Sequence, residues 1–385
     1  MKSTHVLPVL ATAAASLVLA AGAGATRSKP VACGDTITAS VKLDHDLTDC
    51  PSNGIVIGAD GITLDLNGHT IDGDDALQDC EPGTDCDLGV LNSGHRAVTI
   101  KGGEVHGFGT GVVVAGADDN RLRDLAVTAN EFVGVFMGDD SGGGDISRSS
   151  VTRNALTYEG PGILLFNAHD IRVTRNVVSA NGDSGISAGE SRRTLIADNV
   201  VNDQPLGIAA DVDDSVITRN RTLRSGVVLI GDHNTLSRNY LAGTPHCPDD
   251  VCGQSGTISF EGGTDNVIEH NLVERTLEPG IRVAAFEPET PPADGNTVRH
   301  NVIRGALDGI RVQETATHTL LDGNVAVGSA DDGIDVANAA TTLRRNVADR
   351  NDDLGIEAVT GVTDGGHNRA HGNGNPAQCL NVSCH

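Results

Sequence analysis

A short segment repeats along most of this 385-residue chain, and it constrains the fold more than any other sequence feature. Each copy has an apolar residue three positions before an asparagine and another one or two positions after it. A Gly-Ile pair or a close equivalent follows before the next copy begins. The anchor asparagines are 19 to 32 residues apart, usually about 22, and they are Asn176, Asn199, Asn220, Asn239, Asn271, Asn301, Asn324, Asn346 and Asn368. A repeat of this length indicates a solenoid rather than a globular core.

The repeated segments are short and alternate between apolar and polar residues, which predicts strands. Leucine-rich repeats have a similar period, but they need leucine at a position where this chain has residues such as Asn234 and Thr319. A second short strand after each glycine also argues against them, and the lack of a six-residue period excludes a left-handed hexapeptide helix. We therefore predict an all-β fold, a right-handed parallel β-helix of about 13 turns over residues 54–375.

Stacked parallel strands place equivalent side chains about 4.8 Å apart. A column of inward asparagine amides can then form hydrogen bonds along the axis and satisfy its own buried polar groups. We expect many of the 48 glycines to provide the positive φ angles of the corners. Residues 26–53 and 376–385 are expected to form caps that cover the open ends of the coil.

The cysteines form four close pairs in the sequence. This spacing favours four local disulfides in an oxidising compartment. A zinc site built from two CxxxxC pairs is the alternative, which the wide separation of those pairs along the repeat disfavours. The predicted disulfides join Cys33 with Cys50, Cys80 with Cys86, Cys247 with Cys252, and Cys379 with Cys384.

Residues 1–25 have the pattern of a signal peptide, with Lys2 before an apolar run and Ala23-Gly24-Ala25 before a cleavage site at Thr26. An N-terminal membrane anchor is the alternative, but the apolar run is short for a span. No later segment approaches 18 apolar residues. We therefore expect bacterial export to the extracellular space without membrane insertion.

With this repeat over residues 54–375, the chain resembles the secreted right-handed parallel β-helix repeat proteins, the pectate-lyase-like and NosD-like superfamily. The resemblance implies the fold and an extracellular role with polysaccharides, although unrelated activities use the same scaffold. The Asp-Pro-His core of mannuronan epimerases is missing from the most similar stretch, Phe132–Asp139. A NosD-like copper role needs soft ligands, and the methionines are Met1 and Met137 alone.

The residue after each inward isoleucine is expected to point to solvent. In four consecutive turns this column presents Arg282, Arg311, Asp335 and Glu357, with Glu314 just beyond. Lyases and epimerases of acidic polysaccharides use cations to neutralise a uronate carboxylate and a base to remove the adjacent proton. The five residues are therefore our candidate catalytic set, with Arg282 and Arg311 as the cations. A solvent-exposed salt-bridge ladder is the alternative.

Two other patterns involve charged residues. The residue before the anchor asparagine is usually Arg or His, which indicates either a track for a polyanionic glycan or a corner column paired with neighbouring acids. Asp211, Asp213 and Asp214 form our candidate Ca²⁺ site, because Ca²⁺ prefers clustered carboxylate oxygens. Solvated turn residues are the alternative for these aspartates.

The net charge is −25, from 27 basic and 52 acidic residues, and it opposes nucleic-acid binding. We expect a secreted protein that binds an extracellular acidic polysaccharide and, if it is an enzyme, modifies it as a lyase or epimerase. A non-catalytic structural or adhesion-type rod is the alternative. The sequence carries no indication of the oligomeric state.

Overall fold

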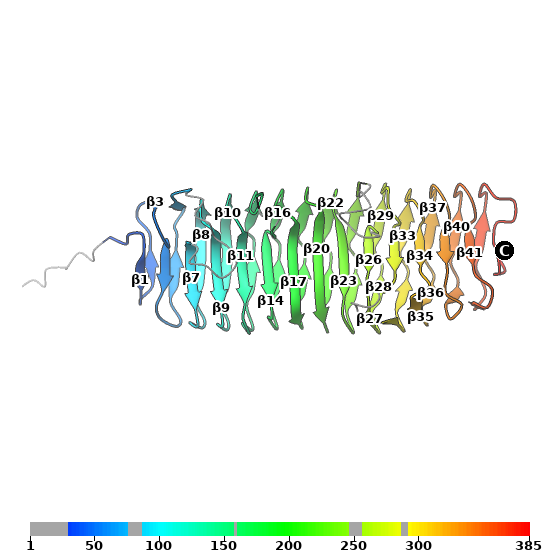
Figure 1. Ribbon diagram of the computed structural model, residues 1–385, viewed down its shortest axis with the longest axis horizontal. Helices are drawn as coiled ribbons and strands as arrows, with labels where there is room; N and C mark the ends of the chain where they lie inside the picture. Colours follow the sequence, from blue (N-terminus) through cyan, green and yellow to red (C-terminus); the bar gives the residue numbers. More distant parts are fainter. Residues whose placement is uncertain (1–29, 76–86, 158–159, 246–255, 286–291) are drawn as a thin grey trace, which may run out of the picture. The chain divides into compact units, whose positions relative to one another are not determined.

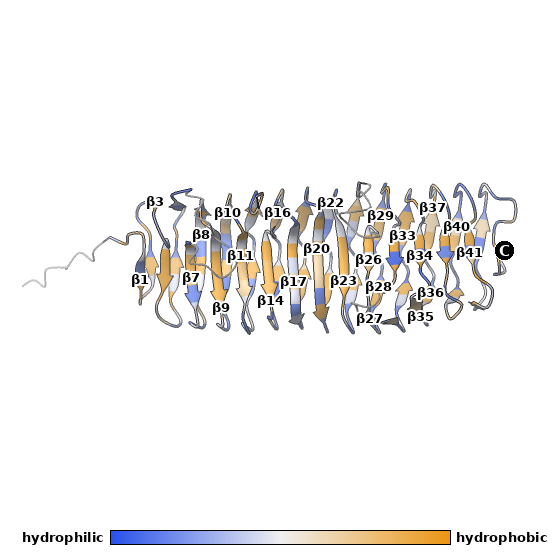
Figure 2. Ribbon diagram, in the orientation of Figure 1, coloured by the Kyte–Doolittle hydropathy of each residue, from blue (hydrophilic) through white to orange (hydrophobic). Residues whose placement is uncertain are grey.

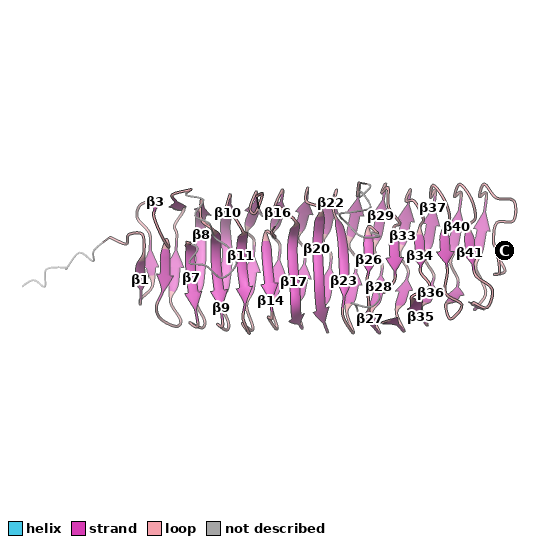
Figure 3. Ribbon diagram, viewed as in Figure 1, coloured by secondary structure: helices cyan, strands magenta, loops and turns pink. Residues whose placement is uncertain are grey.

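The computed structural model describes residues 30–75, 87–157, 160–245, 256–285 and 292–385. Residues 1–31 and 32–385 form separate units, and the following account concerns the second unit by itself. All of its described regular elements are β-strands, as Figure 3 shows. None of the described residues belongs to a helix with the length and apolar character needed to cross a membrane.

One sheet contains 14 parallel strands that stack in chain order from β1 to β41 (Figure 1), which confirms the prediction of about 13 turns. We call it the first sheet. Its strands are β1 (Asp35–Ile37), β4 (Ile55–Ile57), β7 (Leu88–Ser93), β9 (Thr110–Ala115), β11 (Val133–Gly138), β14 (Ile163–Phe166), β17 (Ser184–Arg192), β20 (Leu206–Asp213), β23 (Gly226–Ile230), β26 (Ile258–Phe260), β30 (Ile281–Val283), β34 (Ile310–Val312), β38 (Ile334–Val336) and β41 (Ile356–Ala358).

Two further ladders complete each turn, and both pass through the long strands β8 (Thr99–His106) and β10 (Arg121–Thr128). The other strands of the second ladder are β2 (Val41–Lys42), β5 (Thr63–Asp65), β12 (Asp145–Ser147), β15 (Arg172–Thr174), β18 (Leu195–Ala197), β21 (Val216–Thr218), β24 (Thr235–Ser237), β28 (Val267–Glu269), β32 (Thr297–Arg299), β36 (Leu320–Asp322), β39 (Thr342–Arg344) and β42 (Thr363–Asp364).

The remaining strands of the third ladder are β3 (Leu47–Cys50), β6 (Thr70–Gly73), β13 (Ser150–Thr152), β16 (Val177–Ser179), β19 (Val200–Asn202), β22 (Arg221–Leu223), β25 (Tyr240–Ala242), β29 (Leu272–Glu274), β33 (Val302–Arg304), β37 (Val325–Val327), β40 (Val347–Asp349) and β43 (Arg369–His371). A small sheet at one corner joins β27 (Gly263–Thr264), β31 (Ala293–Asp294) and β35 (Ala316–Thr317).

The coil starts earlier than the predicted boundary at residue 54. Strands β1, β2 and β3 lie within the segment 26–53 and pair with β4, β5 and β6. This segment therefore contributes a complete turn of the coil.

Two of the four predicted disulfides are confirmed, and both lie near the ends of the coil as expected. Cys33–Cys50 has a Cα–Cα distance of 5.4 Å, and Cys379–Cys384 has one of 6.2 Å. The other two predicted disulfides, Cys80 with Cys86 and Cys247 with Cys252, lie outside the described residues and stay predictions. The predicted signal peptide, residues 1–25, also lies outside them.

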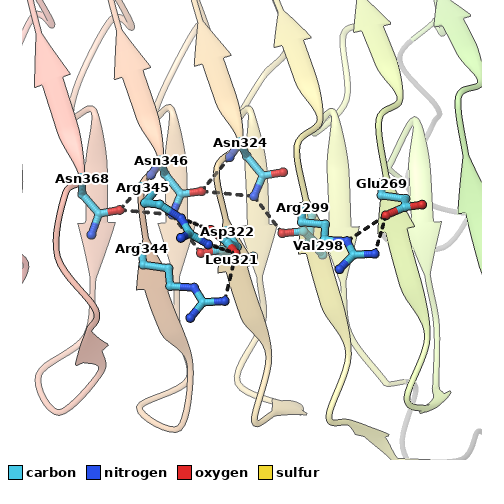
Figure 4. A network of polar contacts seen from close by, with 10 residues as sticks. All are labelled: Glu269, Val298, Arg299, Leu321, Asp322, Asn324, Arg344, Arg345, Asn346 and Asn368. Atoms are coloured by element: carbon cyan, nitrogen blue, oxygen red, sulfur yellow. Dashed lines mark hydrogen bonds and ion pairs between the residues drawn. The ribbon is translucent and has the colours of Figure 1, made fainter.

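The predicted asparagine column is confirmed. Each anchor asparagine is at most 2% exposed, and from Asn176 to Asn346 its Nδ2 donates to Oδ1 of the next asparagine along the axis. This contact measures 3.1 Å from Asn324 to Asn346 and 3.2 Å from Asn346 to Asn368, and Figure 4 draws both as dashed lines. The same Oδ1 atoms also accept hydrogen bonds from backbone N–H groups. The asparagine side chains therefore provide the buried backbone groups at the corner of each turn with the partners that water would otherwise supply.

Our expectation about glycine at the corners was wrong in part. The residue before the anchor asparagine adopts the positive φ, although it is usually not glycine: the angle is 58° at Arg175, 56° at His270 and 57° at Arg345. The glycine before each inward isoleucine is instead required by close packing. A Cβ on Gly309 would lie 2.3 Å from the carbonyl oxygen of Gly333 in the next turn.

The core is a narrow stack of aliphatic side chains. The isoleucines that follow these glycines point inward, and Ile281, Ile310, Ile334 and Ile356 are all fully buried. Figure 2 shows hydrophobic residues concentrated in the strands and hydrophilic residues in the turns between them. The inward alternation also determines which residues of the first sheet point outward, and the candidate site is built on that outward face.

Candidate active site

The first sheet carries a column of polar side chains over its last five strands. The register pairs Ser259 with Arg282, Arg282 with Arg311, Arg311 with Asp335, and Asp335 with Glu357. These pairings confirm the alignment expected from the repeat. The catalytic role of the aligned residues stays a prediction.

The expectation that Arg282 points into solvent was wrong, because its side chain is only 2% exposed. Its guanidinium lies against the small Ser259 of the preceding turn and donates to Ser259 Oγ over 3.2 Å and to Gln313 Oε1 over 3.0 Å. Glu261 Oε1 lies 3.7 Å from Nη1. Burial lowers the pKa of Arg282 and raises the pKa of Glu261. Arg282 therefore acts here as a buried bridge between neighbouring turns.

Arg311 is about one-third exposed and makes two ion pairs. One joins it to Asp308, three residues earlier in the same turn. The other joins its Nε to Asp335 Oδ2 in the next turn over 3.3 Å. Both cations of the predicted catalytic set are thus engaged by acidic side chains of the protein itself.

Two buried aspartates that were not among our candidates lie beside this column. Asp308 and Asp332 occupy the position before Gly309 and Gly333 in consecutive turns, and they are 0% and 4% exposed. The backbone N–H of Asp332 donates to Asp308 Oδ1 over 3.2 Å, and the N–H of Leu354 donates to Asp332 Oδ1 over 2.8 Å. The signal that identifies them is an aspartate directly before the Gly-Ile pair of the repeat, where other turns have residues such as Ser184 or Leu206; Asp60 also precedes Gly-Ile, but it lies outside this register and is exposed.

The aspartates retain protons at unusually high pH. Burial raises the pKa of Asp308 to about 6, in spite of the opposing charge of Arg311. Burial also raises the pKa of Asp332 to about 7, and a hydrogen bond with Glu357 and the charges of Asp331 and Glu357 act in the same direction. A carboxyl group that keeps its proton near neutral pH beside a second carboxylate is a suitable general acid.

The same cluster contains the one group of described residues whose side chains meet the distance requirement for a shared metal ion. One oxygen each of Asp308, Asp331 and Asp332 lie within 4.8 Å of one another. Carboxylate oxygens of this kind suit a hard cation such as Ca²⁺.

The other predicted residues are not brought into the cluster. Asp211, Asp213 and Asp214 are exposed at the end of β20 and beyond it, and they do not form a group that meets the same 4.8 Å requirement. The pKa of Asp211 is raised by burial of its carboxyl group and by the charge of Asp213, although the residue as a whole is exposed. Glu314 is exposed just beyond β34, where its carbonyl accepts a hydrogen bond from Asn338.

The parallel coil defines the protein as a β-solenoid. The column of acids and arginines on its first sheet, with the buried aspartates beside it, forms the candidate active site. The chain matches the family described as right handed beta helix region over residues 88–222 and 204–352, more than half of its length. It therefore belongs to this family of right-handed β-helix proteins.

Comparison with solved structures finds the same fold. The lid-deleted form of DFA-IIIase from Arthrobacter chlorophenolicus A6 is similar with a TM-score of 0.51 and 12% identity, over 73% of this chain and 70% of that one. The same enzyme in complex with GF2 has a TM-score of 0.49 and 14% identity, over 68% and 70%. The alginate lyase from Paenibacillus sp. str. FPU-7 has a TM-score of 0.45 and 11% identity, over 66% and 91%. Comparison with curated proteins finds no match.

Proposed function

We propose that this protein binds a polysaccharide across the outward face of β26–β41 and cleaves its glycosidic bonds by acid–base catalysis. The observation that carries the proposal is the buried Asp332 carboxyl group, which is hydrogen-bonded to Glu357 at the edge of a partly exposed polar column. Two carboxyl groups with different protonation states are the minimum equipment of most glycoside-cleaving sites.

In the proposed reaction, Asp332 donates its proton to the glycosidic oxygen as the bond from that oxygen to the anomeric carbon breaks. A water molecule adds to the anomeric carbon from the opposite side of the sugar, and Asp335, held by Arg311 in the adjoining turn, accepts the proton that this water loses. Glu357, which is hydrogen-bonded to Asp332, adds negative charge beside the developing cationic sugar. Proton and hydroxyl are thereby added across the cleaved bond.

The charges around the cluster favour a neutral sugar at the point of cleavage. Even with protons on Asp308 and Asp332, the acids Asp331, Asp335 and Glu357 outnumber Arg311, which is already paired twice, and Arg282, which is buried. A uronate carboxylate would meet more negative than available positive charge. The lyase or epimerase activity on an acidic polysaccharide that we expected from the sequence is therefore the alternative to hydrolysis, and the experiment described below distinguishes the two.

We further propose that the protein works outside the cytoplasm. The two disulfides near the ends of the coil support an oxidising compartment, in agreement with the signal peptide expected at residues 1–25.

The test is an incubation of the protein with neutral and uronate-containing polysaccharides, with and without Ca²⁺. New reducing ends are measured for hydrolysis, and ultraviolet absorbance of unsaturated sugars for elimination. We expect new reducing ends from a neutral polymer, and a loss of about 100-fold or more in Asp332→Asn and Glu357→Gln. Asp352→Asn, an exposed acid in a neighbouring turn, is the matched control.

Formation of unsaturated products would contradict hydrolysis and show that the protein acts as a lyase. Absence of any change in every polymer would contradict catalysis and favour the alternative of a non-catalytic extracellular rod.

A further inference from the structure

A hollow of about 250 Å³ lies on another face of the coil, over strands β12, β15 and β18 of the second ladder. Four arginines line it: Arg148, Arg172, Arg175 and Arg219. Arg148, Arg175 and Arg219 are corner residues with positive φ, and Arg172 points outward from β15. Four guanidinium groups around one small hollow are notable in a chain with a net charge of −25.

The hollow exists because the outward side chains at its base are small. Ser147, Thr174 and Ala197 occupy one column in successive turns. Later turns carry long side chains in the same column, among them Glu269 and Arg299, which form an ion pair across it (Figure 4). The column stays small through Thr218 and Ser237, so the hollow lies in the part of the coil where the arginines gather.

Two of the arginines are held in place by acids of the preceding turn. Asp124 accepts from Nε and Nη2 of Arg148, both over 2.8 Å. Asp198 accepts from Nε and Nη2 of Arg219 over 2.7 Å and 2.9 Å. Because a guanidinium has five N–H groups, each of these two arginines keeps donors for a ligand while its position is set by the acid.

The other two arginines are exposed, and within the described part of the chain neither Arg172 nor Arg175 forms an ion pair. Asp145, which is in register with Arg172, accepts a hydrogen bond from Ser147 Oγ over 2.6 Å. The lining thus contains four arginines and two aspartates, and two of these arginines form no ion pair with the described residues.

We propose that this hollow binds the carboxylate groups of an acidic polysaccharide whose chain runs along the corner of the coil. The planar guanidinium matches a carboxylate with two parallel hydrogen bonds. The corner repeats this charge at Arg148, Arg175, Arg219 and Arg238, so a polymer with regularly spaced carboxylates meets a cation in most turns. A small anion would use only one of these positions.

This site is separate from the carboxyl cluster and does not depend on the proposed cleavage. The ligand it fits is a polyanionic glycan, one of the two interpretations of the basic column, whereas the acidic cluster on the first sheet favours a neutral sugar. A single polymer with neutral and acidic parts would fit both sites, and so would two different polymers. The binding experiment tests only the acidic ligand.

The experiment measures binding of a galacturonic acid tetrasaccharide to the full chain by titration calorimetry, with maltotetraose and inorganic phosphate as comparison ligands. We expect Arg172→Ala/Arg175→Ala to weaken binding of the uronate tetrasaccharide at least tenfold. Alanine is compatible with the corner at 175, because Ala129 and Ala180 adopt the same backbone conformation with φ of 54°. Arg153→Ala/Arg350→Ala removes the same charge from two other exposed corners and should bind within twofold of the parent.

Thermal unfolding establishes that each variant is folded, and Arg172→Gln/Arg175→Gln replaces the alanine pair if it is not. Undiminished binding by the folded double variant would overturn the proposal, and so would equal affinity for maltotetraose. If phosphate binds as tightly as the tetrasaccharide, the site binds simple anions, and the proposal that it recognises a polymer is contradicted.

Discussion

The backbone N–H of Asp332 donates to Oδ1 of Asp308 over 3.2 Å, which stacks two buried carboxyl groups in consecutive turns of the coil. The parallel register enforces this proximity, because the residue before each glycine lies directly above its equivalent in the next turn. Burial disfavours the ionised form of each carboxyl group and raises the pKa of both, and the chain thus creates a neutral carboxyl group from an ordinary amino acid.

Activity should therefore depend on the protonation of Asp332. If Asp332 is the general acid, kcat/KM falls as the pH rises through about 7, because the carboxyl group loses the proton that it must donate. The pH–rate profile of the parent checks this, with reducing-end formation as the signal. Asp352→Asn should keep the profile, and a rate that stays constant from pH 6 to about 9 would assign the acid to another residue.

Asp332 should also make folding stability depend on pH. Its folded-state pKa of about 7 is above the ordinary value of 3.8, so the folded state binds more protons between these values. The free energy of unfolding contributed by this group is then highest below pH 4 and falls as the pH rises to about 7, by roughly 2 to 4 kcal/mol. Because asparagine does not titrate, the free energy of unfolding of Asp332→Asn, measured with denaturant, should lack this pH-dependent contribution. A difference between parent and variant that does not change from pH 4 to pH 7 would contradict the shifted pKa.

Asn301→Ala should destabilise the coil by about 2 to 4 kcal/mol. The Oδ1 of Asn301 accepts from both the backbone N–H and the Nδ2 of Asn271, each over 3.0 Å, and both donors would remain buried without it. Urea unfolding provides the measurement. Asn167→Ala, at an exposed position, should cost less than about 1 kcal/mol, and equal effects at the two sites would refute the special role of the ladder.

Gly309→Ala should be more disruptive than its single methyl group suggests. The new Cβ would lie 2.3 Å from the carbonyl oxygen of Gly333 and 2.5 Å from Ala326 Cβ, and the stacked backbones cannot separate without breaking strand pairs. We expect a loss of more than about 2 kcal/mol in thermal or urea unfolding. Gly189→Ala, whose nearest neighbour is Phe166 Cδ2 at 3.3 Å, is the matched control and should lose little stability.

Much of the fold could be predicted from the sequence because the repeat has a direct physical counterpart. Each anchor asparagine needs another asparagine one turn away, so the spacing of Asn271, Asn301 and Asn324 already specified the stacking. The outward column through Arg282, Arg311 and Glu357 followed from the same spacing.

The chemistry of the site depended on contacts that spacing does not encode. Arg282 is buried because Ser259 is small and Gln313 lies within reach, and neither relation follows from the repeat. The protonated state of Asp332 requires burial as well as Glu357 in the next turn. An aspartate before a glycine looks like a solvated turn residue until its surroundings are known.

The asparagine ladder has a direction. From Asn176 to Asn346 each amide nitrogen donates to the next asparagine toward the C-terminal end, and from Asn176 to Asn368 each amide oxygen accepts from the N-terminal side. Any rung can therefore follow any other, whatever the number of residues between them, which here varies from 19 to 32. Duplication or deletion of one entire coil leaves every amide with a partner, whereas loss of half a coil leaves a donor and an acceptor stranded. The length of this protein is thus free to change in evolution, but only in whole coils.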